Sequence, residues 1–162
     1  MKGPVRVAPW LALAALLAVA DHASKTAVAS ALRLGEAREV TSFFNLVLAH
    51  NRGAAFSFLS DAGGWQRLLF IGIAVAATAV IVAMLLRHSG ERLFCAGLAL
   101  ILGGALGNLW DRIALGYVVD FLDFHAFGWH FWAFNLADSA ITVGAGLLIL
   151  DSLRPAGAAR KA

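Results

Sequence analysis

The chain has 162 residues, of which 60% are hydrophobic and only 14% are charged, and its mean hydropathy is +0.78. A soluble domain is about half apolar and about a quarter charged, so this composition excludes an ordinary soluble protein and predicts an integral membrane protein. The basic residues are few and scattered, which gives no support to a nucleic-acid partner. One cysteine, Cys95, excludes an intramolecular disulfide.

Four apolar segments predict an all-α membrane protein, because each approaches the roughly 20 residues that a helix needs to cross a bilayer. The expected spans are residues 10–31, 67–86, 93–111 and 133–151 of a single domain, 1–162. The first span contains Ala18-Val19-Ala20, which is typical of a signal-peptide cleavage site. The helical pattern continues past that point without Gly or Pro, so we favour a retained span that carries Asp21 and Lys25.

The basic residues predict the orientation of the four spans, which place both termini on one side of the membrane. The side of the termini and of the loop between spans two and three carries seven of them: Lys2, Arg6, Arg87, Arg92, Arg154, Arg160 and Lys161. On the opposite side, three arginines are diluted by acidic residues. The positive-inside rule therefore predicts that both termini are cytoplasmic.

The outer loop, residues 33–66, is long for a connector and is predicted to form a small β element on the outer side, between the first two helices. Residues 40–48 have the β-branched and aromatic content of a strand. Asn51-Arg52-Gly53 favours a turn, because Asn and Gly tolerate positive φ. Residues 54–59 are a candidate return strand.

Two acids stand in unfavourable surroundings. Asp120 follows Val118-Val119 in the short loop expected between spans three and four, and Asp138 lies near the start of the last span. An ionisable residue inside a membrane is costly and is a functional candidate for that reason. Two carboxylates in a poorly solvated site do not both ionise easily, so one keeps its proton. An aspartyl protease dyad has this requirement, since one acid activates water and the other polarises the carbonyl.

Other polar residues are expected at the same depth in the outer half of the bundle, at about 1.5 Å per helical residue. Asp21 and Lys25, four residues apart, share a helix face and either only neutralise each other or contribute to the site. Asn108, Asp111 and Arg112 share a face of the third span. We interpret them as a supporting polar network, with an interfacial charge pair as the alternative.

Asn135, three residues before Asp138, is predicted to share its helix face and to orient a carboxylate or a substrate carbonyl; a polar stripe facing another helix is the alternative. Gly103 and Gly107 form a G-x-x-x-G, which lets another helix approach closely. The aromatic residues between the two acids suit an interfacial belt or a lipid groove: Phe121, Phe124, Phe127, Trp129, Phe131, Trp132 and Phe134.

A metal site is not expected. The candidate ligands match no familiar metal-binding spacing: His22, His125, His130 and Asp123.

Five segments, in this order, carry a family resemblance: D-H-A-S-K at 21–25, N-R-G-A-A-F at 51–56, G-G-A-L-G-N-L-W-D-R at 103–112, V-V-D-F at 118–121 and F-N-L-A-D-S at 134–139. With them the chain resembles lipoprotein signal peptidase (signal peptidase II), a family of bacterial inner-membrane aspartyl proteases. The V-V-D-F segment selects Asp120 rather than Asp123 as the first acid.

The resemblance implies that Asp120 and Asp138 are the catalytic dyad, with eight supporting or substrate-binding residues: Asp21, Lys25, Asn51, Gly53, Asn108, Asp111, Arg112 and Asn135. It implies a diacylglyceryl-modified prolipoprotein as substrate, cut by water just before its lipidated cysteine. It also implies globomycin-type inhibitors. We expect no cofactor, no metal and a monomer among inner-membrane lipids, with the site near the periplasmic face.

Two other classes of function remain open at this point. A small proton-coupled transporter would use intramembrane acids as a relay, but it predicts charges through the full membrane depth, whereas the second span is nearly bare of them. A non-catalytic assembly subunit would use Gly103 and Gly107 as a dimer face. In that case the acids should tolerate isosteric substitution.

Overall fold

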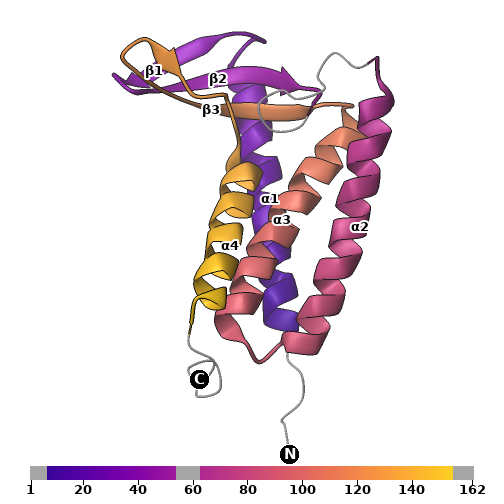
Figure 1. Cartoon of the computed structure of the whole chain (residues 1–162). Coiled ribbons are helices and arrows are strands. Elements are labelled where there is room, and N and C mark those ends of the chain that lie inside the picture. The colour runs from indigo at the N-terminus through magenta and orange to yellow at the C-terminus, as the bar shows by residue number, and fades with distance from the viewer. Residues whose placement is uncertain (1–6, 54–62, 155–162) are drawn as a thin grey trace, which may run out of the picture.

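The computed structural model describes residues 7–53 and 63–154. Four helices run side by side beneath a small sheet: α1 (Ala8–Ala31), α2 (Trp65–His88), α3 (Arg92–Ala114) and α4 (Leu136–Ser152). Within the described ranges, α1, α2 and α3 are long and apolar enough to cross a membrane, and α4 is shorter, at 17 residues. The first helix starts and the last ends at the end of the bundle away from the sheet (Figure 1). The protein is a mostly helical membrane protein.

α3 is the central helix and packs against each of the other three. Its Leu98 and Leu102 join Ala14 of α1 and Leu85 of α2 in a buried apolar cluster. Lipid tails are as apolar as these side chains, so close packing rather than escape from water holds such helices together. Small residues on α3 permit that packing.

The G-x-x-x-G of α3 faces α1. A Cβ placed on Gly103 would lie 2.7 Å from the carbonyl oxygen of Ala14, and one on Gly107 would collide with the carboxylate of Asp21. The expectation that these glycines allow close helix packing is confirmed. The alternative that they form a dimer face is wrong, because α1 of the same chain occupies that face.

The sheet has four antiparallel strands in the order β1 (Ala37–Thr41), β2 (Phe44–Asn51), β3 (Val118–Ala126) and β4 (Trp129–His130). The β element is therefore built from two loops and not only from the one between the first two helices. The connection from α3 to α4 is a hairpin, so the expected short loop around Asp120 is wrong. Pairing with β2 supplies the backbone partners that convert this segment into a strand.

The single strand expected at residues 40–48 is also wrong, because a turn at Ser42 and Phe43 divides it. Thr41 pairs with Phe44 across this turn, and the Thr41 hydroxyl accepts a hydrogen bond from the Phe43 N–H at 3.4 Å. Such local side-chain bonds compete with a continuous strand. The candidate return strand at residues 54–59 lies outside the described residues.

α4 begins at Leu136, later than the expected start at residue 133. Asn135 is its N-cap, with extended backbone at φ −134° and ψ −176°, and Phe134 before it bridges to Leu122 of β3. Asn135 and Asp138 are thus related as N-cap and third helical residue, and not as two residues on one helix face. Asp138 lies in the first turn of α4, and Figure 1 shows that α4 begins on the sheet side of the bundle.

Candidate active site

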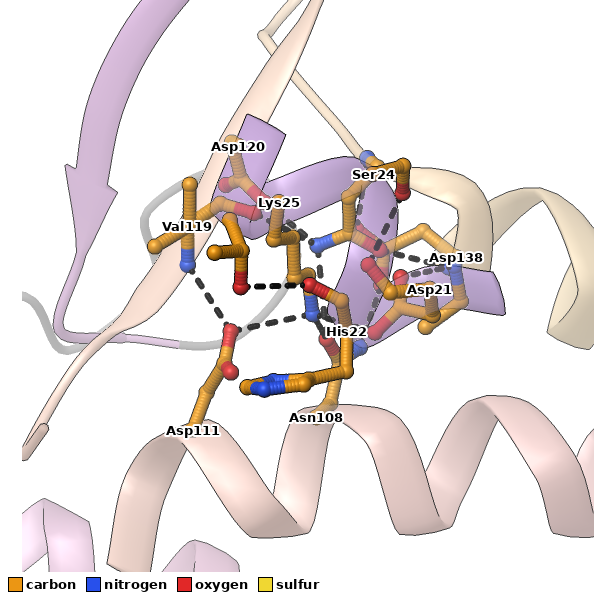
Figure 2. Close-up of polar contacts among 12 residues, drawn as sticks. Asp21, His22, Ser24, Lys25, Asn108, Asp111, Val119, Asp120 and Asp138 are labelled. Atoms are coloured by element: carbon orange, nitrogen blue, oxygen red, sulfur yellow. Dashed lines mark hydrogen bonds and ion pairs between the residues drawn. The ribbon is translucent and has the colours of Figure 1, made fainter. Parts of the chain in front are cut away.

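Polar side chains from α1, α3, β3 and α4 converge where the helices meet the sheet, as Figure 2 shows. Most of them are buried: Asp21, Lys25, Asn108, Asp111, Asp120 and Asn135. In an apolar interior each such group needs a partner.

Lys25 is the centre of the lower part of the cluster. Its Nζ lies 2.7 Å from Oδ2 of Asp21 and 3.0 Å from Oδ2 of Asp111. It also donates to Oδ1 of Asn108 at 2.9 Å. The ammonium has three donors, and all three are used. The predicted Asp21–Lys25 pair is confirmed as a contact, and it extends across to α3.

The two carboxylates around Lys25 also anchor backbone from other elements. Oδ1 of Asp21 accepts from the N–H of Ala137 at 2.9 Å, and Oδ2 of Asp111 accepts from the N–H of Val119 at 3.1 Å. The first contact satisfies a donor in the first turn of α4, where backbone N–H groups have no partner within the helix. One ion-paired cluster therefore fixes both segments that carry the two candidate acids.

Asp120 lies on β3 and is only 3% exposed. Its Oδ1 accepts from Nδ2 of Asn135 at 2.7 Å, and its Oδ2 accepts from Nδ2 of Asn51 at 3.0 Å. Burial, followed by the charge of Asp138, raises the pKa of Asp120 to about 7, although the two amide hydrogen bonds oppose this shift. At neutral pH this carboxyl is thus close to half protonated.

Asp138 lies in a different environment. Its Oδ1 accepts from Nδ2 of Asn108 at 2.8 Å, and its Oδ2 accepts from the backbone N–H of Asn135 at 3.4 Å. In return, Oδ1 of Asn135 accepts from the N–H of Asp138 at 2.9 Å, which completes a capping box. Asp138 is therefore held by two hydrogen bonds at the start of α4.

Arg112 joins the cluster to the outer loop. Its guanidinium donates to the carbonyl oxygen of Gly53 at 2.9 Å and to that of Asn108 at 3.2 Å, and it lies over the Phe70 ring at 5.2 Å from the centroid. The N–H of Gly53 bonds Oδ1 of Asn51 at 2.9 Å. The described part of the chain thus brings together all ten predicted site residues.

A groove of about 470 Å³ opens beside this cluster, and we name it the α4 groove. The wall has polar groups from Asn51, Asn108 and Asp138. The rest of the wall is aromatic and aliphatic and comes from the β4–α4 segment and from α4, with Phe131, Trp132, Phe134, Ile141 and Val143 among its residues. An apolar groove with a few convergent polar groups is typical of a ligand site.

Comparisons with known proteins agree with this arrangement. A family model described as signal peptidase (SPase) II matches residues 13–154. The lipoprotein signal peptidase of Paraburkholderia phytofirmans is 60% identical over 148 residues, covering 91% of this chain and 86% of the relative. That of Burkholderia multivorans is 57% identical over 154 residues, covering 95% and 93%. The chain belongs to the signal peptidase II family.

Solved structures agree as well. A bacterial membrane enzyme determined by the in meso method at 2.3 Å resolution superposes with a TM-score of 0.84 at 30% identity, covering 94% of this chain and 92% of the other. A second, determined at 1.9 Å, gives a TM-score of 0.81 at 29% identity over 95% and 98%. The family resemblance predicted from the five motifs is confirmed.

Sequence reasoning missed several residues of this signal peptidase fold. Thr142 lines the α4 groove, and its position four residues after Asp138 places it on the same helix face, which was a usable signal. Arg67 donates to the carbonyl oxygens of Arg112 and Ile113 at 2.8 and 2.9 Å and so caps the end of α3. No local pattern identifies that contact, because it joins residues 45 and 46 positions apart.

The histidines do not gather into one site. His130 contacts both carboxylate oxygens of Asp123 at 3.0 Å on the β3–β4 hairpin, and its ring stacks on that of His125. His22 lies on α1 and contacts Trp110. Across residues 7–53 and 63–154, no group of three or more His, Cys, Asp and Glu residues has the geometry to hold a metal ion. Asp123 pairs with Asn45 and His130 instead of joining Asp120.

Proposed function

We propose that the chain is an aspartyl endopeptidase that removes the signal peptide from diacylglyceryl-modified prolipoproteins, cutting just before the lipidated cysteine. Asp120 and Asp138 form the dyad, and water is the nucleophile. The observation that carries this proposal is the arrangement of two acids joined through Asn135, one with its pKa raised to about 7, mainly by burial, and the other placed at a helix start. Membership of the signal peptidase II family supports the same reaction.

The two acids take different roles in this proposal. Asp138 lines the α4 groove, where the substrate is proposed to bind, so it is the general base. Asp120 is buried and has a pKa of about 7, so it keeps the shared proton and is the general acid. A pair whose environments separate the two protonation states is suited to acid–base chemistry at neutral pH.

The reaction then follows in two steps. Asp138 takes a proton from a water molecule as its oxygen attacks the scissile carbonyl, and Asp120 donates its proton to the carbonyl oxygen. In the second step the tetrahedral intermediate collapses: the C–N bond breaks, the proton on Asp138 passes to the leaving amine, and Asp120 recovers its proton from the hydroxyl. No covalent acyl-enzyme is needed, and both acids return to their starting states.

The α4 groove is the proposed binding site for the substrate. Asn51, Asn108 and Arg112 at its polar end hold the peptide backbone beside Asp138. The aromatic and aliphatic wall accommodates the diacylglyceryl group, since apolar side chains bind acyl chains without desolvating polar groups. Globomycin-type peptide inhibitors are expected to occupy the same groove.

The protein is proposed to be a monomer of the bacterial inner membrane with four spans and both termini in the cytoplasm. Three helices have the length and apolarity of a span, and α4, with 17 residues, is at the lower limit of the roughly 17–25 residues that cross a bilayer. Its packing along α3 supports a fourth span. The site then lies under the sheet, near the periplasmic face.

The test is cleavage of a purified lipidated prolipoprotein in detergent by wild type, Asp120→Asn and Asp138→Asn. Each substitution should abolish cleavage while the circular dichroism spectrum stays helical. Asp123→Asn is the matched control: it lies on the same strand as Asp120, is also buried, and pairs with Asn45 and His130 outside the dyad. It should retain cleavage.

Near-wild-type cleavage by either dyad variant would reject the dyad. A wild type that leaves the lipidated substrate intact but cleaves the same prolipoprotein without lipid would keep the protease and reject the substrate class.

A further inference from the structure

A second groove lies between α1 and α3, and we name it the α1/α3 groove. It encloses about 400 Å³, and its walls include Ala18, Val19, His22, Leu106, Trp110 and Ile113. Trp110 follows Asn108 by two residues, which places the two side chains about 200° apart around α3. Because Asn108 lines the α4 groove, the two grooves open on opposite sides of α3.

The α1/α3 groove lies between two helices that are expected to be surrounded by lipid. Both of its helices are candidate membrane spans, and Trp110 and Ile113 at its edge are 57% and 53% exposed. Such a surface on a soluble protein would need a protein partner, but here the solvent is the hydrocarbon of the bilayer. A concave apolar surface in hydrocarbon accommodates an acyl chain along its length.

Gly107 lies between the groove and the ion-paired cluster. It lines the groove, and a Cβ placed on it would collide with the carboxylate of Asp21. A chain in this groove therefore lies directly behind the Asp21–Lys25 ion pair, with only the α1–α3 contact between them. Its packing would hold the two helices together at the level of the site.

Two side chains of the groove wall, among the described residues, carry a polar N–H: the indole of Trp110 and the imidazole of His22. The His22 imidazole contacts Trp110 edge-on, with the ring centroids 6.0 Å apart at 78°, and makes no hydrogen bond within the described part of the chain. Figure 2 draws no dashed contact to this ring. An unpaired donor in a membrane is costly, and an ester carbonyl of a lipid is an acceptor at the depth where Trp side chains gather.

We infer that the α1/α3 groove binds one acyl chain of a bilayer glycerolipid, whose ester carbonyl accepts a hydrogen bond from His22. The occupant is a lipid of the membrane and not the proposed prolipoprotein, because the α4 groove, on the opposite face of α3, holds the dyad residue Asp138. A lipid bound there forms part of the wall behind the site.

The test uses the full chain in vesicles of phosphatidylethanolamine and phosphatidylglycerol with a trace of a diester phospholipid that carries a diazirine in one acyl chain. After illumination, mass spectrometry of the peptides locates the labelled residues. Leu68, Ile73 and Val80 of α2 are the internal control, since they are 74%, 55% and 59% exposed and line no groove described here. Labelling at Trp110 and Ile113 should exceed labelling at these three by about five-fold or more, the effect of one net hydrogen bond.

Two comparisons identify the contacts responsible. An ether-linked analogue, which lacks the carbonyl, should label the groove of wild type about five-fold less, and His22→Phe should abolish the difference between ester and ether. Leu106→Trp, which fills the groove, should reduce labelling, while Val75→Trp on the exposed face of α2 should not.

Equal labelling of the groove and of α2 in wild type would overturn the inference and leave only ordinary surrounding lipid. Equal labelling by ester and ether lipids would overturn the role of His22. Both decisive measurements use wild type, and neither uses proteolysis, so the result is independent of the proposed function.

Discussion

The side-chain amide of Asn135 donates to Oδ1 of Asp120 at 2.7 Å, while its oxygen caps the helix that carries Asp138. One fully buried residue thus sets the position of β3 against the start of α4. A displacement of about 1 Å in a catalytic group can cost roughly 100-fold in rate. The relative position of the two acids therefore depends on this one amide.

Substitution of Asn135 separates its two contacts. Serine is as good an N-cap as asparagine, whereas alanine loses about 1 kcal/mol of cap stability, and neither side chain reaches Asp120. We expect Asn135→Ser to be more stable than Asn135→Ala by about that amount, and both to lose about 100-fold in cleavage. Thermal unfolding and single-turnover cleavage measure the two effects. Wild-type cleavage by Asn135→Ser would show that the Asp120 contact is dispensable.

The pKa of Asp120 predicts how activity depends on pH. As general acid it must be protonated, and its pKa is about 7, so kcat/KM should fall as pH rises through about 7. The pH profile of kcat/KM reports groups of the free enzyme, which is the state the structure describes. Initial rates from pH 5 to pH 9 in one detergent measure it. A flat profile across this range would remove Asp120 from the role of acid.

The same pKa predicts a stability effect. A carboxyl whose pKa is raised on folding contributes stability that is complete below its unfolded pKa of about 3.9 and is lost as pH rises through about 7. Asp120→Asn removes the buried charge and keeps the shape. It should therefore gain thermal stability relative to wild type at pH 8, more than at pH 5, while it loses cleavage. An equal difference at both pH values would contradict the raised pKa.

Sequence reasoning succeeded where structure is determined by local pattern. The apolar runs predicted the helices, and spacing along the spans predicted that Asp21, Lys25, Asn108 and Asp111 meet at one depth, as their contacts show. Helical periodicity is a property of neighbouring residues, so one sequence suffices to detect it. The choice of Asp120 over Asp123, which came from the V-V-D-F segment of the family resemblance, stays a prediction; the structure shows that the two acids have different partners.

It failed where distant segments pair. β3 is a strand because β2 lies beside it, and Asn45 reaches Asp123 across 78 residues of sequence. The spacing of Asn135 and Asp138 is the same in a capping box and on a helix face, so spacing alone did not distinguish them. Phe134 pairs with Leu122 of β3, and the backbone of Asn135 after it is extended. Asn135 is therefore the N-cap of α4, and its contacts with Asp138 form a capping box.

Removal of Lys25 should destabilise the bundle strongly. It is 3% exposed and pairs with Asp21 and Asp111, which are also buried, so Lys25→Met leaves two carboxylates without a counter-charge. Breaking a buried pair in this way typically costs about 3–5 kcal/mol. Arg38→Met is the matched control, because its pair with Glu36 is 3.6 Å long and exposed, and such pairs contribute under about 1 kcal/mol. Unfolding by denaturant in mixed micelles measures both. Equal losses would mean that the Lys25 cluster is open to water.

A single methyl group tests the packing behind the dyad. In Gly107→Ala the new Cβ collides with Oδ2 of Asp21, and movement of Asp21 weakens its contact with the N–H of Ala137 at the start of α4. Overpacking of this kind costs about 1–3 kcal/mol. The displacement also shifts Asp138, so cleavage should fall with stability.

Gly146→Ala on α4 is the matched control for Gly107→Ala, since nothing lies within 4 Å of its added Cβ. An alanine in a helix interior is better than glycine by about 0.5–1 kcal/mol, so this variant should be slightly more stable than wild type and equally active. Melting temperature and cleavage rate are measured side by side for both variants. If Asp21 transmits the strain, the melting temperature should fall in Gly107→Ala and rise slightly in Gly146→Ala, and only Gly107→Ala should lose cleavage. If Gly107→Ala behaved like Gly146→Ala, α1 would be free to move away from α3, and Asp21 would not determine where α4 begins.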